Sequence, residues 1–139
     1  MILLDTNVVS ELMKPVPARP VAEWVARQAA TSLYTTTITE AEILHGVMLL
    51  PAGQRRARLQ SAAENMFAED FRGRVLPFGS DAARAYALIA TQRRRAGRPI
   101  SHFDAQIAAI GRSARAMIAT RNTADFEGCG VELVDPWRP

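Results

Sequence analysis

The sequence has 139 residues, of which 48% are hydrophobic and 22% are charged, and this composition favours one globular domain over residues 1–139 and excludes a largely disordered chain. Its 17 Lys and Arg residues exceed its 14 acidic residues, so the net charge of +3 suits an anionic partner without identifying one. The single cysteine, Cys129, excludes an intrachain disulfide, and no apolar run approaches the roughly 20 residues of a membrane span. We therefore expect a cytoplasmic protein with no membrane partner.

Short apolar runs alternate with amphipathic stretches along the whole chain. In chain order, the patterns predict a strand at residues 2–4, helices at 7–13 and 21–29, a strand at 33–36, helices at 38–50 and 53–71, a strand at 75–78, helices at 81–95 and 101–114, and strands at 117–120 and 131–134. This alternation predicts an α/β fold, a three-layer α/β/α sandwich in which helices cover both faces of a mostly parallel central sheet.

Three carboxylates stand out against this predicted fold. Asp5 directly follows the first strand, and ligands of such folds gather at the carboxyl ends of the strands. Glu42 and Asp104 lie on helices with otherwise apolar surroundings. Each also has a purely structural explanation: Asp5 can cap the following helix, Asp104 stands three residues after Ser101 as in a capping box, and Glu42 can be an exposed helical residue.

Carboxylates that share one pocket repel each other, so at least one pKa rises unless a cation compensates. Mg²⁺ or Mn²⁺ is the expected compensating ion, because both accept hard oxygen ligands. Such an ion activates water and neutralises charge on a scissile phosphate, which makes Asp5, Glu42 and Asp104 candidate metal ligands and catalytic residues.

Four segments resemble the motifs of the PIN-domain ribonucleases, in the same order and over essentially the whole chain. Residues 1–11 read MILLDTNVVSE, residues 39–46 read TEAEILHG, residues 101–108 read SHFDAQIA and residues 119–126 read ATRNTADF. The tail at residues 131–137, VELVDPW, also looks like that of the VapC and FitB toxins.

The resemblance implies a PIN-like fold and Mg²⁺- or Mn²⁺-dependent endonucleolytic cleavage of RNA by the toxin of a toxin–antitoxin pair. It further implies a homodimer and a cognate DNA-binding antitoxin. The protein would contact DNA only indirectly, through that antitoxin. Some family members have a fourth aspartate where this chain has Asn122. Either Asn122 or Asp125 is then the candidate for that position, with Thr6 and Thr120 as supporting polar residues.

Arginine clusters occur at residues 55–58 and 93–98. Because a guanidinium group can bond two phosphate oxygens at once, we expect some of these residues to bind the RNA backbone, with Arg93, Arg94 and Arg95 as the named candidates. Solvated helix faces are the simpler explanation of the same charges.

Alternatives remain open at this point. The chain could be a catalytically silent module that binds nucleic acid or an antitoxin, or a metal-free ribonuclease that uses His45 and His102. A phosphoacceptor receiver domain would need a lysine near its acidic pocket, and the only lysine is Lys14. Surplus apolar residues predict a helix pair buried against a second protomer: Leu49, Leu50, Leu59 and Met66.

Overall fold

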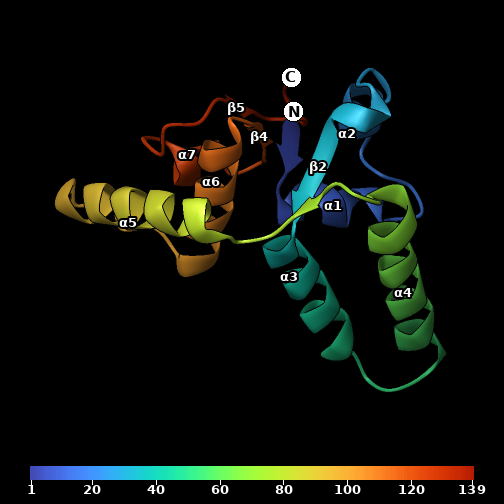
Figure 1. The fold of residues 1–139 in the computed structure, drawn as a ribbon. Coiled ribbons are helices and arrows are strands. Elements are labelled where there is room, and N and C mark those ends of the chain that lie inside the picture. Colours follow the sequence, from blue (N-terminus) through green and yellow to red (C-terminus); the bar gives the residue numbers. More distant parts are fainter.

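Five short strands form one sheet at the centre of the computed structural model, which describes residues 1–139 (Figure 1). The strands are β1 (Ile2–Leu4), β2 (Leu33–Thr36), β3 (Val75–Leu76), β4 (Met117–Ala119) and β5 (Leu133–Val134). Their spatial order is β3-β2-β1-β4-β5, and every pairing is parallel. The predicted α/β fold is confirmed, and the sheet is parallel throughout rather than mostly so.

The helices follow the predicted pattern with small shifts at their ends. They are α1 (Thr6–Leu12), α2 (Arg19–Ala26), α3 (Thr37–Met48), α4 (Gln54–Asn65), α5 (Ser80–Arg95), α6 (His102–Ala114) and α7 (Thr123–Phe126), with a 3₁₀ turn, η1, at Ala30–Ser32. The helix predicted over 53–71 is an α-helix only as far as Asn65, and η2 (Met66–Asp70) is a π-helical turn. The four-residue helix α7 was not predicted, because so short a segment has no periodicity.

Side chains of the central strands point alternately to two hydrophobic clusters, one on each face of the sheet. Leu3 and Ile118 enter the cluster formed with α5 and α6, whereas Leu4 and Ala119 enter the cluster formed with α1, α2 and α4. All four are fully buried. Helices on both faces explain why these strands are almost continuously apolar.

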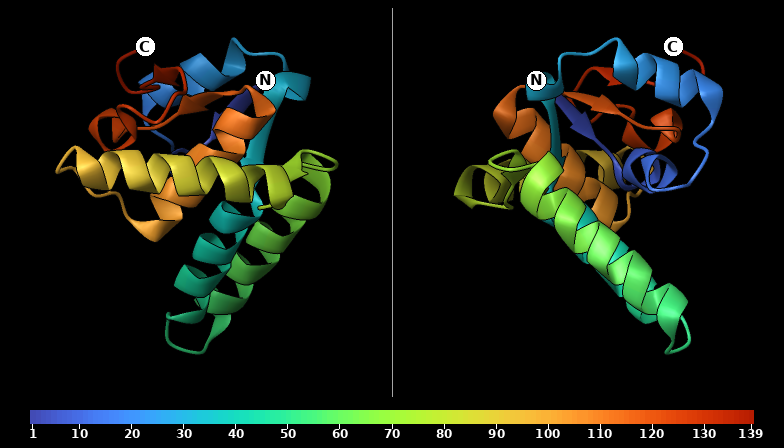
Figure 2. Two further views of the ribbon diagram at one scale, coloured as in Figure 1. Left: turned by 60° about the vertical axis from the view of Figure 1, so that its left-hand side comes forward. Right: turned by 90° about the vertical axis from the view of Figure 1, so that its right-hand side faces the viewer.

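Helices α3 and α4 run side by side and project from the sheet as an arm, while α5 and α6 cover the other side of the molecule (Figures 1 and 2). Two hydrophobic side chains on the arm are well exposed, Met48 at 60% and Leu49 at 72%. None of the helices combines the length and apolarity that a membrane span requires.

Candidate active site

Asp5 lies at the carboxyl end of β1, in the middle of the sheet, and is the N-cap of α1. One carboxylate oxygen accepts a hydrogen bond from the Thr6 backbone N–H at 2.8 Å, and the other accepts from the Thr120 hydroxyl at 2.7 Å and from the Asn7 side-chain amide at 3.3 Å. The residue is only 4% exposed. Burial raises the pKa of Asp5 to about 6, although the bonds from Thr120 and Thr6 act in the opposite direction.

Glu42 lies on α3, which begins after β2 with Thr36 as its N-cap. The Thr6 hydroxyl donates to the Glu42 carboxylate at 2.8 Å and lies 3.0 Å from the Thr39 hydroxyl, so Thr6 joins α1 to α3. Glu42 is half-buried. Burial raises the pKa of its carboxyl group, the Thr6 bond lowers it, and the charge of Asp104 raises it further.

Asp104 lies in the first turn of α6, where its backbone N–H donates to the capping Ser101 hydroxyl at 3.2 Å. Ser101 therefore caps α6 as expected, but the second bond of a capping box, from the Ser101 backbone N–H to the Asp104 carboxylate, is not formed. The Asp104 carboxylate is half-buried, and burial raises its pKa; the Ser101 hydroxyl and the charge of Arg93 lower this pKa, whereas the charge of Asp125 raises it further. Capping explains the helix start but not why a carboxylate is kept at this position.

The structure brings the three predicted carboxylates within electrostatic reach of one another. The charges of Asp104 and Glu42 both raise the pKa of Asp5, and none of the three carboxylates forms a salt bridge. Such a concentration of unpaired negative charge is the situation that a bound cation relieves. The side chains as placed do not form a ready-made cluster of three His, Cys, Asp or Glu residues around one ion.

The residues that follow β4 lie next to Asp5 at the carboxyl end of the strands. Thr120 is fully buried and connects Asp5 to the following loop, because its hydroxyl oxygen also accepts from the Asn122 backbone N–H at 3.1 Å. The Asn122 side chain is exposed and makes no hydrogen bond. Asp125 is also exposed, but its charge reaches Asp104. Of the two candidates for a fourth acidic position, Asp125 carries a charge that acts on Asp104, whereas Asn122 is joined to Asp5 through Thr120.

Sequence reasoning did not include Asn7 or Thr39 among the candidate site residues. Asn7 donates to Asp5 and to the Thr120 hydroxyl, and its side-chain oxygen accepts from the Arg121 backbone N–H. The Thr-Asn pair after Asp5 was the available signal for Asn7, whereas nothing local marked Thr39.

The prediction that Arg93 binds RNA is wrong. Arg93 is 7% exposed and donates to the backbone carbonyls of Arg98, Asp125 and Glu127 at 2.7–2.9 Å. It therefore holds the α7 segment against α5 and cannot bind RNA. It points inward because it lies on the same face of α5 as the buried Ile89. Arg94 and Arg95 are exposed, so their predicted role stays a prediction.

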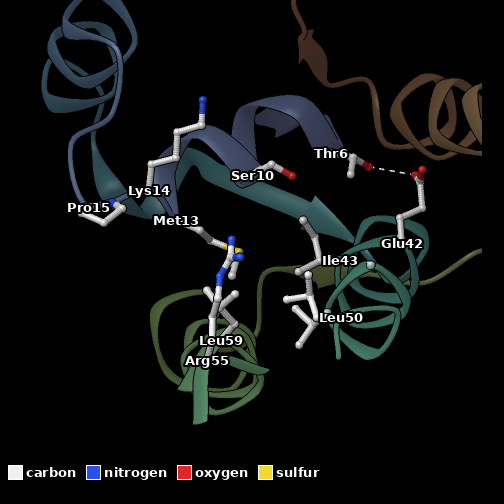
Figure 3. Close-up of a pocket in the computed structure, with 12 residues that line it drawn as sticks. Thr6, Ser10, Met13, Lys14, Pro15, Glu42, Ile43, Leu50, Arg55 and Leu59 are labelled. Atoms are coloured by element: carbon white, nitrogen blue, oxygen red, sulfur yellow. Dashed lines mark hydrogen bonds between the residues drawn. The ribbon is translucent and has the colours of Figure 1, made fainter. Parts of the chain in front are cut away.

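A cleft of about 460 Å³ opens between α1, α3 and α4 (Figure 3). Thr6 and Glu42 lie at one side of it, and the cations Lys14 and Arg55 lie toward the other. Its walls are mainly apolar and include Met13, Ile43, Val47, Leu50 and Leu59. A second hollow, of about 280 Å³, lies between Glu42 and Phe103, so Glu42 faces two open spaces.

The geometry does not favour the histidine alternative or the receiver alternative. The Tyr86 hydroxyl and the Nδ1 atom of His102 form a hydrogen bond at 2.7 Å. His102 and His45 line different hollows, so they do not form a pair of acid and base. Lys14 forms an ion pair with Glu11 at 3.1 Å, at the end of α1.

Residues 2–128 match the model of the PIN domain family. The chain is 42% identical over 139 residues to VapC ribonuclease Y4jK of Sinorhizobium fredii, covering 100% of this chain and 99% of that protein, and 36% identical over 137 residues to toxin FitB of Neisseria gonorrhoeae, covering 99% of each. A solved structure of FitAB bound to an IR36 DNA fragment superposes with a TM-score of 0.93 at 36% identity, covering 100% of this chain and 97% of that chain.

Proposed function

The chain belongs to the PIN domain family, and from that premise we propose that it is a Mg²⁺- or Mn²⁺-dependent endoribonuclease, the toxin of a toxin–antitoxin pair. The best support for this proposal is that Asp5, Glu42 and Asp104 converge at the carboxyl end of the central strands. Each of the three carboxylates has a raised pKa, and none forms a salt bridge. A carboxylate cluster that costs stability and is not paired internally is typical of a functional site.

The donor set fits a hard divalent cation, because it consists of carboxylate and hydroxyl oxygens. Asp5, Glu42 and Asp104 would hold the ion. When bound, the ion supplies activation of water and neutralisation of the charge that develops on the phosphate. The chain itself fixes Asp5 through Thr120 and Asn7 and fixes Glu42 through Thr6, so these side chains are oriented before any ligand arrives.

The proposed activity is tested by incubating labelled single-stranded RNA with purified, antitoxin-free protein in Mg²⁺, Mn²⁺ or EDTA. We expect metal-dependent cleavage that Asp5→Asn and Asp104→Asn each reduce at least about 100-fold, since each removes a charged ligand. The matched control is Asp81→Asn, because Asp81 also lies in the first turn of a helix but is exposed on α5. Cleavage that survives EDTA would contradict the metal requirement.

A catalytically silent binding module is the alternative to this proposal. It predicts RNA or antitoxin binding with no cleavage of any RNA tried and no heat of Mg²⁺ or Mn²⁺ binding by calorimetry. The three unpaired carboxylates argue against it, because a module that only binds RNA gains nothing from negative charge at its surface.

For the partners, we propose a cognate DNA-binding antitoxin whose tail occupies the cleft of Figure 3. The names of the relatives support a toxin role, and FitAB is bound to DNA in its structure. An apolar tail segment would fit between Met13 and Leu59 and cover Glu42. Leu59→Asp should then abolish co-purification with the antitoxin, whereas Leu88→Asp on α5 should not; retained co-purification would reject the cleft as the docking site.

We also propose that the protein works in the cytoplasm as a homodimer. Met48 and Leu49 support an interface on the arm, because they are the most exposed apolar pair of α3 and its end. Of the other residues expected at this interface, Leu50 and Leu59 line the cleft and Met66 packs against the hydrophobic cluster that contains Leu4, and their predicted role stays a prediction. Light scattering should give twice the monomer mass for the wild type and a monomer for Leu49→Asp; a monomeric wild type at micromolar concentration would refute the dimer.

A further inference from the structure

Arg121 lies just after the strand end at which Asp5 and Thr120 meet, and none of the predicted site roles includes its side chain. Arg121 directly follows Thr120, whose hydroxyl donates to Asp5, and the Arg121 backbone N–H donates to the Asn7 side chain at 3.2 Å. The backbone of Arg121 is thus tied to the same hydrogen-bond network that fixes Asp5. Its side chain is exposed, makes no hydrogen bond and forms no salt bridge.

The guanidinium group of Arg121 nevertheless has one contact that orients it. It lies over the indole ring of Trp137, 5.0 Å from the ring centroid. Trp137 follows β5, packs against the hydrophobic cluster that contains Leu4 and Ala119, and its backbone N–H donates to the Asp135 carboxylate at 2.9 Å. The ring therefore offers a fixed surface, and a guanidinium stacked on it keeps its N–H edges available for an anion.

Three other cations of the chain are already engaged. Arg93 is buried on backbone carbonyls, and Arg98 forms a salt bridge with Glu127 at 3.3 Å. Lys14 is paired with Glu11. The charge of Arg121 also acts on Glu11, but no salt bridge joins them. Among these cations, Arg121 alone combines exposure, a fixed position and unused donors.

We propose that Arg121, held in place by Trp137, binds a phosphodiester group of the substrate next to the one that is cleaved. This inference rests on the proposed ribonuclease function and adds a substrate-binding residue to it. A carboxylate cluster repels the RNA backbone, so the substrate needs a compensating cation close by. The guanidinium group can bond two phosphate oxygens at once. Trp137 is then a positioning residue that acts through Arg121.

The experiment measures binding of a fluorescent single-stranded RNA to the Asp104→Asn protein in Mg²⁺ by anisotropy, at several KCl concentrations. Adding Arg121→Gln, which keeps a flat side chain on the ring, should weaken binding about 10- to 100-fold, as expected for a charge-assisted contact. The slope of log affinity against log salt should fall by about 0.7, the value for one phosphate contact on a single strand. Arg138→Gln, an exposed arginine of the tail, is the matched control.

Trp137 provides the second readout. Trp137→Phe should keep most of the affinity, because a ring remains under the guanidinium group, whereas Trp137→Ala should lose several-fold. In the Arg121→Gln protein, Trp137→Ala should have little additional effect, since the two residues act as one unit. Thermal unfolding of each variant serves to separate loss of binding from loss of folding.

The outcomes separate this inference from the function on which it rests. If the wild type cleaves RNA and Arg121→Gln leaves both affinity and salt slope unchanged, the inference is overturned and the nuclease function stands. If the wild type neither binds nor cleaves RNA, both fall. Independent, additive effects of Arg121→Gln and Trp137→Ala would reject the positioning role of Trp137.

Discussion

Replacing Asp5 with asparagine should stabilise the protein in the absence of metal, even though it should abolish the proposed activity. Burial raises the pKa of Asp5 from 3.8 to about 6. Each tenfold change in acidity corresponds to about 1.4 kcal/mol, so ionised Asp5 costs the folded state about 3 kcal/mol at alkaline pH. Asparagine still accepts from the Thr6 N–H, but its amide nitrogen replaces the oxygen that accepts from Thr120 and Asn7, and this mismatch of donors costs about 1–2 kcal/mol. The net gain is about 1–2 kcal/mol.

The sign of the pH dependence follows from the direction of the shift. A carboxyl group whose pKa is raised on folding binds its proton more tightly in the folded than in the unfolded chain. Between pH of about 4 and about 6, the free energy of unfolding of the wild type therefore falls as the pH rises, and the full penalty remains above pH of about 6. Asparagine has no such dependence, so the advantage of Asp5→Asn should fade toward pH of about 4.

Urea denaturation in EDTA, followed by circular dichroism at pH of about 8 and about 5, measures this difference. Asp81→Asn is the control, because Asp81 is exposed and its salt bridge to Arg84 is long, at 3.9 Å. Added Mg²⁺ should stabilise the wild type more than Asp5→Asn. If Asp5→Asn is less stable than the wild type, and equally so at both pH values, the assigned burial penalty is wrong.

Three further predictions concern stability and access to the site. Arg93→Ala should cost about 2–4 kcal/mol in urea denaturation, because it removes a buried side chain that donates to three backbone carbonyls. Arg94→Ala should change stability by less than about 0.5 kcal/mol; equal effects of the two substitutions would contradict the structural role of Arg93. Gly111→Ala should cost about 1–3 kcal/mol, since its Cβ would lie 3.0 Å from the Ile118 side chain; a neutral effect would show that Ile118 can move. Gly46→Ala should raise the unfolding free energy by up to about 1 kcal/mol, because alanine favours a helix and nothing lies within 4 Å of the added Cβ. The same substitution should weaken the binding of RNA or antitoxin in the two hollows that Gly46 lines. Unchanged affinity for both would show that neither ligand approaches α3 there.

Local sequence patterns were sufficient for most of the elements. Strands β1 and β4 are short apolar runs, β2 consists of residues that favour strands, and helices α3, α5 and α6 have apolar residues at helical spacing. The ends were less accurate. The predicted strand at 75–78 stops at Leu76, because Pro77 has no N–H to donate to a neighbouring strand. The π turn at Met66–Asp70 has the same composition as the helix before it, so no local signal marked it.

By itself, the sequence determined that the chain alternates strands and helices, that its sheet is parallel, and that Asp5 follows a strand, because these features depend on local periodicity and on which residues end a strand. Motif resemblance identified the family, and the comparisons confirmed it. The assignment of Asp5, Glu42 and Asp104 to catalysis stays a prediction.

Only the tertiary structure decided which polar side chains meet. Thr6 and Glu42 are 36 residues apart, and Asp5 and Thr120 are 115 apart, so their hydrogen bonds depend on how α3 and β4 pack against β1. The structure likewise buried Arg93 and left Arg121 exposed on Trp137, although both are arginines at the ends of regular elements. The sequence gives the charge of each side chain, but whether that side chain is buried depends on residues distant along the chain. Burial separates a structural arginine from one that is available to a substrate.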